Sequence, residues 1–500
     1  MLNVSKITVF TILVGYLFTA GCSAPDSAVD SRPNVIVFYT DDMGWGDLGA
    51  FGNDLISTPS LDRLAAEGQR WTNFYVPAPV CSPSRAALLT GRYPTRSGLY
   101  GVISPVMFPG DSRGIPEAEV TLAEALKDAG YHTGIFGKWH LGDATSAFPT
   151  RHGFDYWFGI PYSNDMNFDG RPGIDYLYQL QISGRGSEIM PIYQALIESF
   201  RAPDYRDYDV PLIRSACDAD GCSDAVIERP VVQPSLTRRL TEEAMSFIRR
   251  HRDAPFFVYI PYSMPHLPIF ADVPFVGQSA AGPYGDTIEE IDASVGQVRS
   301  LLESLDLSEK TLVVFSSDNG PWHAASPDFS GSTGPLRGSK NEVFEGGVRV
   351  PTIFWWKDAL HPMTVDGIGS VMDIFATALS LAGYSDLGDI DGIDLSETLL
   401  KGAASPRSQH AFYRRGQLRA LRQGSFKLHL YDQSDVGDPL ETPQLYNLAE
   451  DPSEATDIAS NHPDAVDTML ETIKHFDAIE RRPPIFDQRF IHLAPLPTAP

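Results

Sequence analysis

Short apolar runs alternate with amphipathic segments along most of this chain. The apolar runs include NVIVFYTDD (34–42), GIFGKWH (134–140), APFFVYIPYS (254–263) and KTLVVFSSDN (310–319). Continuous apolar runs of this length predict strands that are buried on both faces of a sheet. Amphipathic helices are expected between them, at residues 61–68, 121–131, 236–253, 287–307 and 373–384. Strands that alternate with helices indicate an α/β fold with a mostly parallel sheet and right-handed crossovers.

The chain divides into a large unit and a smaller C-terminal one. We expect residues 33–404 to form the large α/β domain, in which residues 163–235 are irregular excursions around a cleft, because they are rich in Gly, Pro, Tyr and charge. Beyond about residue 405, apolar and polar residues alternate around turn signals, as in antiparallel strands, and a helix is expected over 464–480. Residues 405–500 therefore predict a small α+β domain, an antiparallel sheet plus a helix.

The chain begins with a targeting segment. Residues 1–21 carry one cation and then an apolar run too short to span a bilayer, which is typical of a signal peptide. The run ends in TAGC, which resembles a bacterial lipobox and implies a lipid anchor at Cys22, followed by a polar tether over residues 22–32. Ordinary cleavage near Ala20 or Ala24 is the alternative. Either way we expect an exported protein, in the periplasm or as a lipoprotein of the outer membrane or cell surface.

Export bears on the other cysteines. Cys217 and Cys222 lie in the short acidic segment CDADGC, where a local disulfide is expected in an oxidising compartment and two unpaired thiols are the alternative. Cys81 is left without a partner.

The formal net charge of −25 limits the possible partners. A chain this acidic lacks the basic face of a non-specific nucleic-acid binder, so no nucleic-acid partner is expected. An anionic substrate would have to be attracted by a local cluster of cations, because the field of the whole protein opposes its approach.

Two of the predicted strands end in oxygen-bearing side chains. Asp41 and Asp42 end the first, and Asp318 and Asn319 end the last. In open α/β sheets, sites lie outside the carboxyl ends of the strands. Three carboxylates and one amide oxygen that converge there would suit a hard cation, Ca²⁺ or Mg²⁺. A helix cap or turn is the alternative for any one of these acids.

Cys81 opens the segment CSPSRAALLTGR (81–92), in which Pro83 suits the first turn of a helix and Gly91 its end. Cys81 is therefore expected at a helix N-terminus, where the dipole and free N–H groups stabilise anions. A small buried thiol and a thiolate nucleophile are both open alternatives at this point.

The same segment resembles the type I sulfatase signature C-x-P-x-R…T-G-R. Other segments similar to that family follow in the family's order over roughly residues 33–460: NVIVFYTDDMGWGDLGAFGN (34–53), GKWHLG (137–142), PHLPIF (265–270), SDNG (317–320), GSKNEVFEGGVRVP (338–351) and LYNLAEDPSE (445–454). The last resembles a family hallmark that has no catalytic role. The resemblance implies an alkaline-phosphatase-like fold and hydrolysis of sulfate monoesters.

The resemblance also implies the roles of individual residues. Cys81 would be oxidised by a formylglycine-generating maturation enzyme to Cα-formylglycine, whose hydrate, a gem-diol, is the nucleophile of the family. One Ca²⁺ would be held by Asp41, Asp42, Asp318 and Asn319, with the modified Cys81 or bound sulfate completing its shell. The other catalytic residues implied are Arg85, which holds the formylglycine, Lys138 and Lys340, which clamp the sulfate, His140 as base, and His266 as proton donor to the leaving oxygen, alone or with Lys340.

Within the family, the chain looks closest to the arylsulfatase A and N-acetylgalactosamine-6-sulfatase group. GIPYSND (159–165) carries Ser163 and Asn164 where that group commonly has Ser-His, and both are expected to contact sulfate or substrate. Tyr162, Trp322 and His323 are further candidates for the mouth of the pocket, and packing between loops is the alternative. A sulfated saccharide is the expected substrate, with aryl sulfates also cleaved. The alternatives are a phosphonate or phosphate ester hydrolase of the same superfold and a catalytically silent surface lipoprotein that binds sulfated glycans.

Overall fold

A computed structural model describes residues 32–168, 172–325, 329–434 and 437–496. The predicted signal peptide, and all of the predicted tether except Arg32, lie outside these residues. No helix within the described ranges is long and apolar enough to cross a bilayer. Residues 32–500 form one compact unit.

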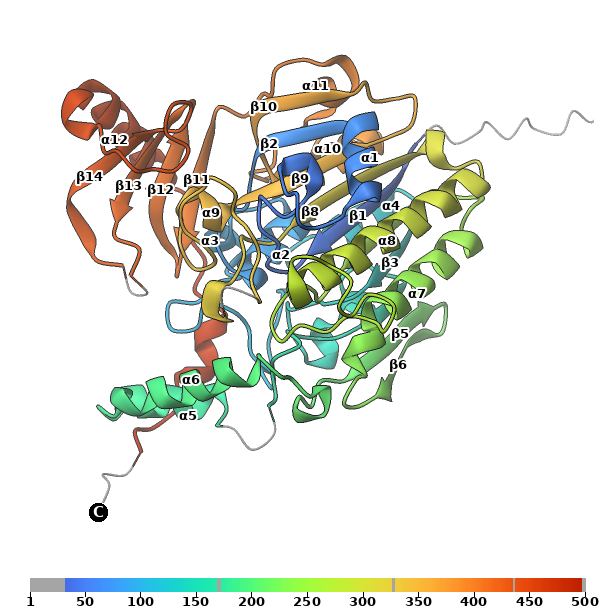
Figure 1. The fold of residues 1–500 in the computed structure, drawn as a ribbon, viewed down its shortest axis with the longest axis horizontal. Helices are drawn as coiled ribbons and strands as arrows, with labels where there is room; N and C mark the ends of the chain where they lie inside the picture. Colours follow the sequence, from blue (N-terminus) through green and yellow to red (C-terminus); the bar gives the residue numbers. More distant parts are fainter. Residues whose placement is uncertain (1–31, 169–171, 326–328, 435–436, 497–500) are drawn as a thin grey trace, which may run out of the picture. The chain divides into compact units, whose positions relative to one another are not determined.

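Within the described residues, ten strands form one large mixed sheet (Figure 1). In spatial order they are β10 (Met363–Ser370), β2 (Gln69–Tyr75), β9 (Arg349–Trp355), β8 (Thr311–Ser317), β1 (Asn34–Thr40), β7 (Phe256–Pro261), β3 (His132–Phe136), β4 (Tyr156–Gly159), β5 (Leu212–Asp218) and β6 (Gly221–Glu228). The central strands β8, β1, β7, β3 and β4 run parallel, and β9, β5 and β6 introduce antiparallel pairs. The sheet is therefore mixed but parallel at its centre.

Helices cover both faces of this sheet. One layer contains α2 (Cys81–Thr90), α4 (Leu122–Asp128), α10 (Val371–Leu381) and α11 (Ser396–Lys401), and the other contains α1 (Pro59–Glu67), α7 (Leu236–Arg250) and α8 (Gly282–Ser304). Strand β1 shows why its sequence is apolar throughout: Val35 and Val37 pack into the first layer, and Ile36 and Phe38 pack into the second. The prediction of a strand buried on both faces is confirmed.

A second sheet of four antiparallel strands follows, β11 (Gln409–Arg414), β12 (Gln417–Gln423), β13 (Phe426–Tyr431) and β14 (Pro439–Asn447). Helix α12 (Pro463–Asp477) buries Met469, Ile473 and Phe476 against it. The predicted fold class, a large mixed α/β sheet with a smaller C-terminal antiparallel sheet and helix, is confirmed.

Residues 163–235 are more regular than their composition predicts. They contain the helices α5 (Ile174–Ile182) and α6 (Ile189–Ser199) and the hairpin β5–β6, which extends the large sheet (Figure 1). The short helices α3 (Pro94–Ser97) and α9 (Glu345–Val348) complete the set of α-helices in the described residues.

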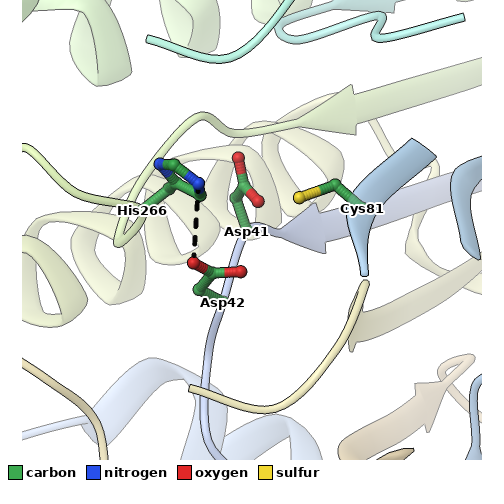
Figure 2. Close-up of side chains that lie close together, drawn as sticks. All are labelled: Asp41, Asp42, Cys81 and His266. Carbon is green, nitrogen blue, oxygen red and sulfur yellow. Dashed lines mark ion pairs between the residues drawn. The ribbon is translucent and has the colours of Figure 1, made fainter. Parts of the chain in front are cut away.

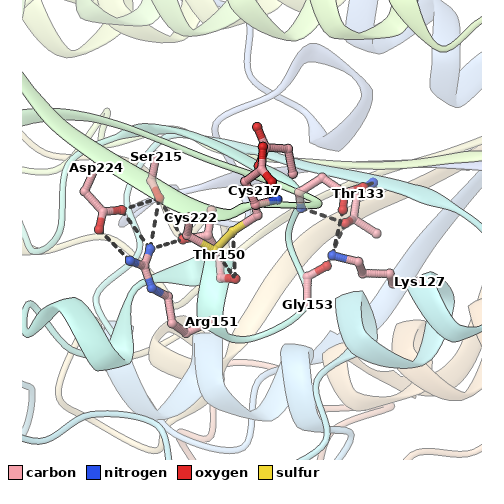
Figure 3. Close-up of a disulfide and its surroundings, with 12 residues drawn as sticks. Lys127, Thr133, Thr150, Arg151, Gly153, Ser215, Cys217, Cys222 and Asp224 are labelled. Atoms are coloured by element: carbon pink, nitrogen blue, oxygen red, sulfur yellow. Dashed lines mark hydrogen bonds and ion pairs between the residues drawn. A yellow bond between two sulfur atoms is a disulfide. The ribbon is translucent and has the colours of Figure 1, made fainter.

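A disulfide joins Cys217 to Cys222 across the β5–β6 hairpin (Figure 3). The same hairpin is tied to the preceding loop by an ion pair of 2.5 Å between Arg151 Nη2 and Asp224 Oδ2. The expected local disulfide is thus present. Disulfides form and persist mainly in oxidising compartments.

Candidate active site

Four adjacent parallel strands bring polar side chains to one edge of the large sheet. Their order is β8, β1, β7, β3, and their carboxyl ends point the same way. The residues that follow these ends are Asp318 and Asn319 after β8, Asp41 and Asp42 after β1, His266 after β7, and Lys138 and His140 after β3. All of them are buried. The predicted convergence of the strand ends is therefore what the topology produces.

Cys81 belongs to the same cluster, but it lies at the start of a helix and not at the end of a strand. It is the first residue of α2, with Val80 as an extended N-cap residue. Ligand atoms of Asp41, Asp42, Cys81 and His266 all lie within 4.8 Å of one another, and Figure 2 shows the Cys81 sulfur beside the Asp41 carboxylate. The prediction of Cys81 at a helix N-terminus is confirmed.

Each carboxylate in the cluster is matched by a cation. Lys138 Nζ donates to Asp41 Oδ2 over 2.6 Å, and Lys340 Nζ donates to Asp42 Oδ2 over 2.8 Å. Arg85 donates from Nε and Nη2 to Asp318 Oδ2, at 2.9 and 2.7 Å. The three cations thus offset the three carboxylates and lie together at the place where an anionic substrate would need local positive charge in so acidic a protein.

Two oxygens in the cluster are suited to a metal ion. Asp41 Oδ1 and Asn319 Oδ1 are buried and accept no hydrogen bond from any described residue. The Asn319 amide is oriented by its Nδ2, which donates to Asp42 Oδ1 over 2.6 Å and to the Gly320 carbonyl over 2.9 Å. Buried acceptors without donors are costly unless something positive binds them. The donor set, carboxylates with one amide oxygen, fits Ca²⁺.

Burial and neighbouring charges shift the pKa values of the acids and of Cys81. Burial opposes ionisation of Asp41, but Lys138 and the other nearby cations hold its pKa well below the usual range. Burial, reinforced by the charge of Asp41, raises the pKa of Asp318 to about 7. Burial also raises the pKa of the Cys81 thiol, although Lys138 and Lys340 oppose this shift. The unmodified Cys81 is therefore a neutral thiol, which disfavours the alternative of a thiolate nucleophile.

The two histidines are held differently. His140 Nε2 donates to the Met107 carbonyl over 2.9 Å, which leaves Nδ1 buried without a partner among the described residues. Burial lowers the pKa of His140 well below its usual range, and the positive charge of Lys138 adds to this shift. His140 is therefore neutral, and its Nδ1 is a free proton acceptor. His266 Nε2 lies 3.6 Å from Asp42 Oδ2 (Figure 2).

The structure separates the two predicted substrate contacts. Ser163 joins the cluster, because its Oγ lies 3.2 Å from Lys138 Nζ and 3.3 Å from His266 Nδ1. Asn164 is buried, and its Nδ2 donates to Gln233 Oε1 over 3.0 Å and to the Pro268 carbonyl over 2.9 Å. The Asn164 amide thus braces the loop that carries His266, and its N–H groups are not available to a substrate.

Trp322 and His323, candidates for the pocket mouth, follow the Asp318–Asn319 segment. The half-buried Trp322 ring lies against both His266, with ring centroids 5.5 Å apart, and Lys340, whose Nζ is 5.0 Å from the ring centroid. The contributions of Gln233 and of the Met107 carbonyl were not predicted. No motif marks either of them, since each acts through a contact made only in the folded chain.

Comparison with known proteins agrees with this geometry. Residues 33–384 match the sulfatase family. The chain is 40% identical to N-acetylgalactosamine-6-sulfatase of Mus musculus over 430 residues, 83% of this chain and 74% of that one. It is 35% identical to arylsulfatase A of Bos taurus over 480 residues, 91% of this chain and 88% of that one.

Solved structures include a similar fold in the PsFucS1 sulfatase from Pseudoalteromonas sp., with a TM-score of 0.73, 30% identity, and coverage of 90% of this chain and 92% of that one. The family match spans the segments that form the buried cluster, from Asp41 to Lys340. The chain therefore belongs to the sulfatase family, whose members are sulfuric ester hydrolases.

Proposed function

We propose that this protein hydrolyses sulfate monoesters of sulfated carbohydrates, with aryl sulfates as further substrates, through a formylglycine made from Cys81 and with one Ca²⁺. The observation that carries the proposal is the position of Cys81 on the first turn of α2, within 4.8 Å of the ligand atoms of Asp41, Asp42 and His266. The name of one relative, N-acetylgalactosamine-6-sulfatase, supports a sulfated sugar as substrate.

The proposed metal site consists of Asp41, Asp42, Asp318 and Asn319. When bound, Ca²⁺ would supply positive charge next to the sulfate oxygens. The buried oxygens Asp41 Oδ1 and Asn319 Oδ1 support this assignment, because neither accepts a hydrogen bond from a described residue, although Asp41 Oδ1 lies 3.7 Å from Arg85 Nη2. Lys138 and Lys340 would share the work of binding the sulfate, since charge stabilisation of this kind usually contributes more to catalysis than any other single effect.

On the nucleophile side, formylglycine at position 81 would supply, as its hydrate, an attacking hydroxyl and a second hydroxyl whose deprotonation releases sulfate. His140 holds a free Nδ1 in a neutral ring and is the proposed base. Arg85 lies on α2, four residues after Cys81, and its two hydrogen bonds to Asp318 fix its fully buried guanidinium. A well-placed base of this kind contributes roughly 10²–10⁴-fold to the rate.

On the leaving-group side, His266 and Lys340 are the proposed proton donors to the ester oxygen. Both rest against Trp322, which would place this ring beside the leaving group. A half-buried aromatic ring at this position suits the apolar face of a sugar ring or an aryl group.

Sulfate release tests the proposal. Wild type and Cys81→Ala are compared, with Ca²⁺ present, on a panel of aryl sulfates and sulfated mono- and oligosaccharides, with released sulfate measured by ion chromatography. We expect release from one class of sugar and from aryl sulfates by the wild type and none by the variant. A Cys217→Ala/Cys222→Ala variant controls for the loss of a sulfur atom elsewhere. Full activity of Cys81→Ala would contradict the proposal.

The same panel extended to phosphate and phosphonate esters distinguishes the rival activity. If these esters turn over faster than the matching sulfates, the protein is a phosphoester hydrolase of the same superfold. Mass spectrometry of the peptide that contains residue 81 shows whether a host maturation enzyme has converted the cysteine.

We also propose export and lipidation at Cys22. The Cys217–Cys222 disulfide supports an oxidising compartment. Metabolic labelling with a fatty-acid analogue is expected to mark the wild type and not Cys22→Ala. Labelling of neither protein, with the chain found soluble in the periplasm, would instead indicate ordinary cleavage.

A further inference from the structure

A buried network of charges joins the C-terminal sheet to the start of α9, directly after the loop that carries Lys340. Its members are Glu345, the first residue of α9, Lys427 and His429 on β13, and Glu454, which ends the LYNLAEDPSE segment. All four side chains are buried, with exposed fractions of 0 to 1%. The catalytic mechanism proposed above uses none of them.

Glu454 is at the centre of this network. Its Oε1 accepts from His429 Nε2 over 2.7 Å and lies 3.2 Å from Lys427 Nζ, while its Oε2 accepts from the Glu345 backbone N–H over 2.7 Å. Lys427 Nζ also donates to Glu345 Oε1 over 2.8 Å. Burial opposes ionisation of Glu345, but Lys427 outweighs it and lowers its pKa to about 2. Lys427, on the C-terminal sheet, therefore contacts both glutamates.

The Lys340 loop, residues 338–344, is fixed on two sides. Toward the catalytic centre, the Lys340 N–H donates to the Pro321 carbonyl and the Asn341 N–H donates to the Pro79 carbonyl, each over 2.9 Å. Toward the C-terminal sheet, the Val343 N–H donates to Gln433 Oε1 over 2.9 Å. The loop therefore connects segments next to the cluster around Cys81 with the C-terminal part of the chain.

The backbone is closely packed where the Lys340 loop leads into α9. A Cβ on Gly347 would lie 2.0 Å from the Glu342 carbonyl oxygen, so the loop folds directly onto the start of the helix. Glu454 itself has a φ of 51°, a left-handed conformation that is uncommon for glutamate. Buried charges are expensive to desolvate, and a network of them is weak evidence for stability alone. Its contacts instead fix Glu345, the residue that directly follows the Lys340 loop.

We propose that Glu454 is a positioning residue for the sulfatase reaction, which acts through the Lys340 loop and keeps Lys340 Nζ against Asp42 and Trp322. The inference rests on the proposed function, in which Lys340 helps to protonate the leaving oxygen. It gives the C-terminal sheet a part in the chemistry although none of its described residues belongs to the cluster around Cys81.

The test uses the dependence on the leaving group. Kinetics of full-length, formylglycine-containing protein are measured on a series of aryl sulfates whose phenols differ in acidity. Because poor leaving groups need proton donation most, we expect Lys340→Ala to lose far more kcat on sulfates of weakly acidic phenols than on 4-nitrophenyl sulfate. Glu454→Gln is expected to show the same pattern, with roughly a tenfold loss at the weakly acidic end and about twofold at the other.

Two further variants sharpen the result. The double variant Glu454→Gln/Lys340→Ala is expected to be no worse than Lys340→Ala, because residues that act through one group are not additive. Glu450→Gln, an exposed glutamate of the same segment, is the matched control and is expected to behave as the wild type. If Glu454→Gln does not fold, Gln433→Ala removes a contact to the same loop and is expected to give the same, weaker pattern.

The outcomes separate the two levels of the argument. Equal losses on all leaving groups for Glu454→Gln and Gln433→Ala, or an additive double variant, overturn the positioning role and leave the proposed function intact. If Lys340→Ala itself shows no dependence on the leaving group, the proposed role of Lys340 fails, and the inference fails with it.

Discussion

Lys138 Nζ lies 2.6 Å from Asp41 Oδ2, and neither side chain is exposed to solvent. Removing the lysine leaves a buried carboxylate without its nearest cation, and it removes one of the two lysines proposed to bind the sulfate. For Lys138→Met we expect kcat to fall by about 10²–10³-fold, the loss typical of one charge-stabilising donor. We also expect unfolding to be easier by about 3–5 kcal/mol without Ca²⁺. Steady-state kinetics and urea unfolding check both, with the half-exposed Lys127→Met as control.

Calcium removal tests the metal site. Chelation is expected to abolish sulfate release, and Ca²⁺ at about 100 times its Kd is expected to raise Tm by roughly 3 °C, because it binds only the folded state. Asn319→Leu removes an oxygen ligand and keeps the volume, so it should lose this dependence of Tm on Ca²⁺. Differential scanning calorimetry with and without Ca²⁺ measures the shift. Activity that survives chelation would argue against a metal at this position.

The stability of the fold should depend on pH through His152. This side chain is 2% exposed and stacks on Trp139, and burial lowers its pKa to about 4. Below about pH 6.5, His152 is protonated in the unfolded chain and still neutral in the folded protein. The free energy of unfolding therefore falls by about 3 kcal/mol between about pH 6.5 and pH 4. His152→Leu should remove that part of the slope in urea unfolding. The exposed His361→Leu should retain it.

The Cys217–Cys222 disulfide should matter for stability and not for catalysis. It closes a short loop at β6, the last strand of the large sheet, well separated in strand order from β1 and β8. Replacing both cysteines with alanine is expected to lower the free energy of unfolding by about 2 kcal/mol, as expected for so short a loop. kcat on aryl sulfates should be unchanged. A large fall in kcat would show that the hairpin supports the site.

Trp322 should set the preference for the leaving group. Trp322→Ala removes the ring that contacts His266 and Lys340, and we expect kcat/KM to fall by about tenfold on aryl and sugar sulfates. Trp322→Phe keeps an aromatic face and should recover most of the loss. An equal loss in both variants would assign the effect to the indole N–H rather than to the ring.

Local sequence was enough to predict the central sheet, the polar residues at its strand ends and the helix that Cys81 begins, whereas Arg85, Lys138, His140, His266 and Lys340 were implied only by the family resemblance. The strand that ends in Asp41 and the strand that ends in Asp318 are apolar over most of their length because both faces are covered, and that pattern is local. Parallel strands then bring their carboxyl ends together whatever lies between them. Cys81 follows from its own segment, since Pro83 and Gly91 mark the two ends of α2.

The helices and strands of residues 163–235 are harder to predict from sequence, because Gly, Pro and charged residues obscure the periodicity of α5, α6 and the β5–β6 hairpin. Those elements owe their form to packing against the rest of the chain.

Sequence by itself thus determined the fold class, the disposition of the acids and the helix that Cys81 begins, because each depends on the period or spacing of neighbouring residues. Only the tertiary structure decided that the Asn164 amide faces Gln233 and Pro268, that His140 is oriented by the Met107 carbonyl, and that Glu454 reaches Glu345. These contacts join residues far apart in the chain. Their geometry is set by how layers pack, and no local pattern encodes it.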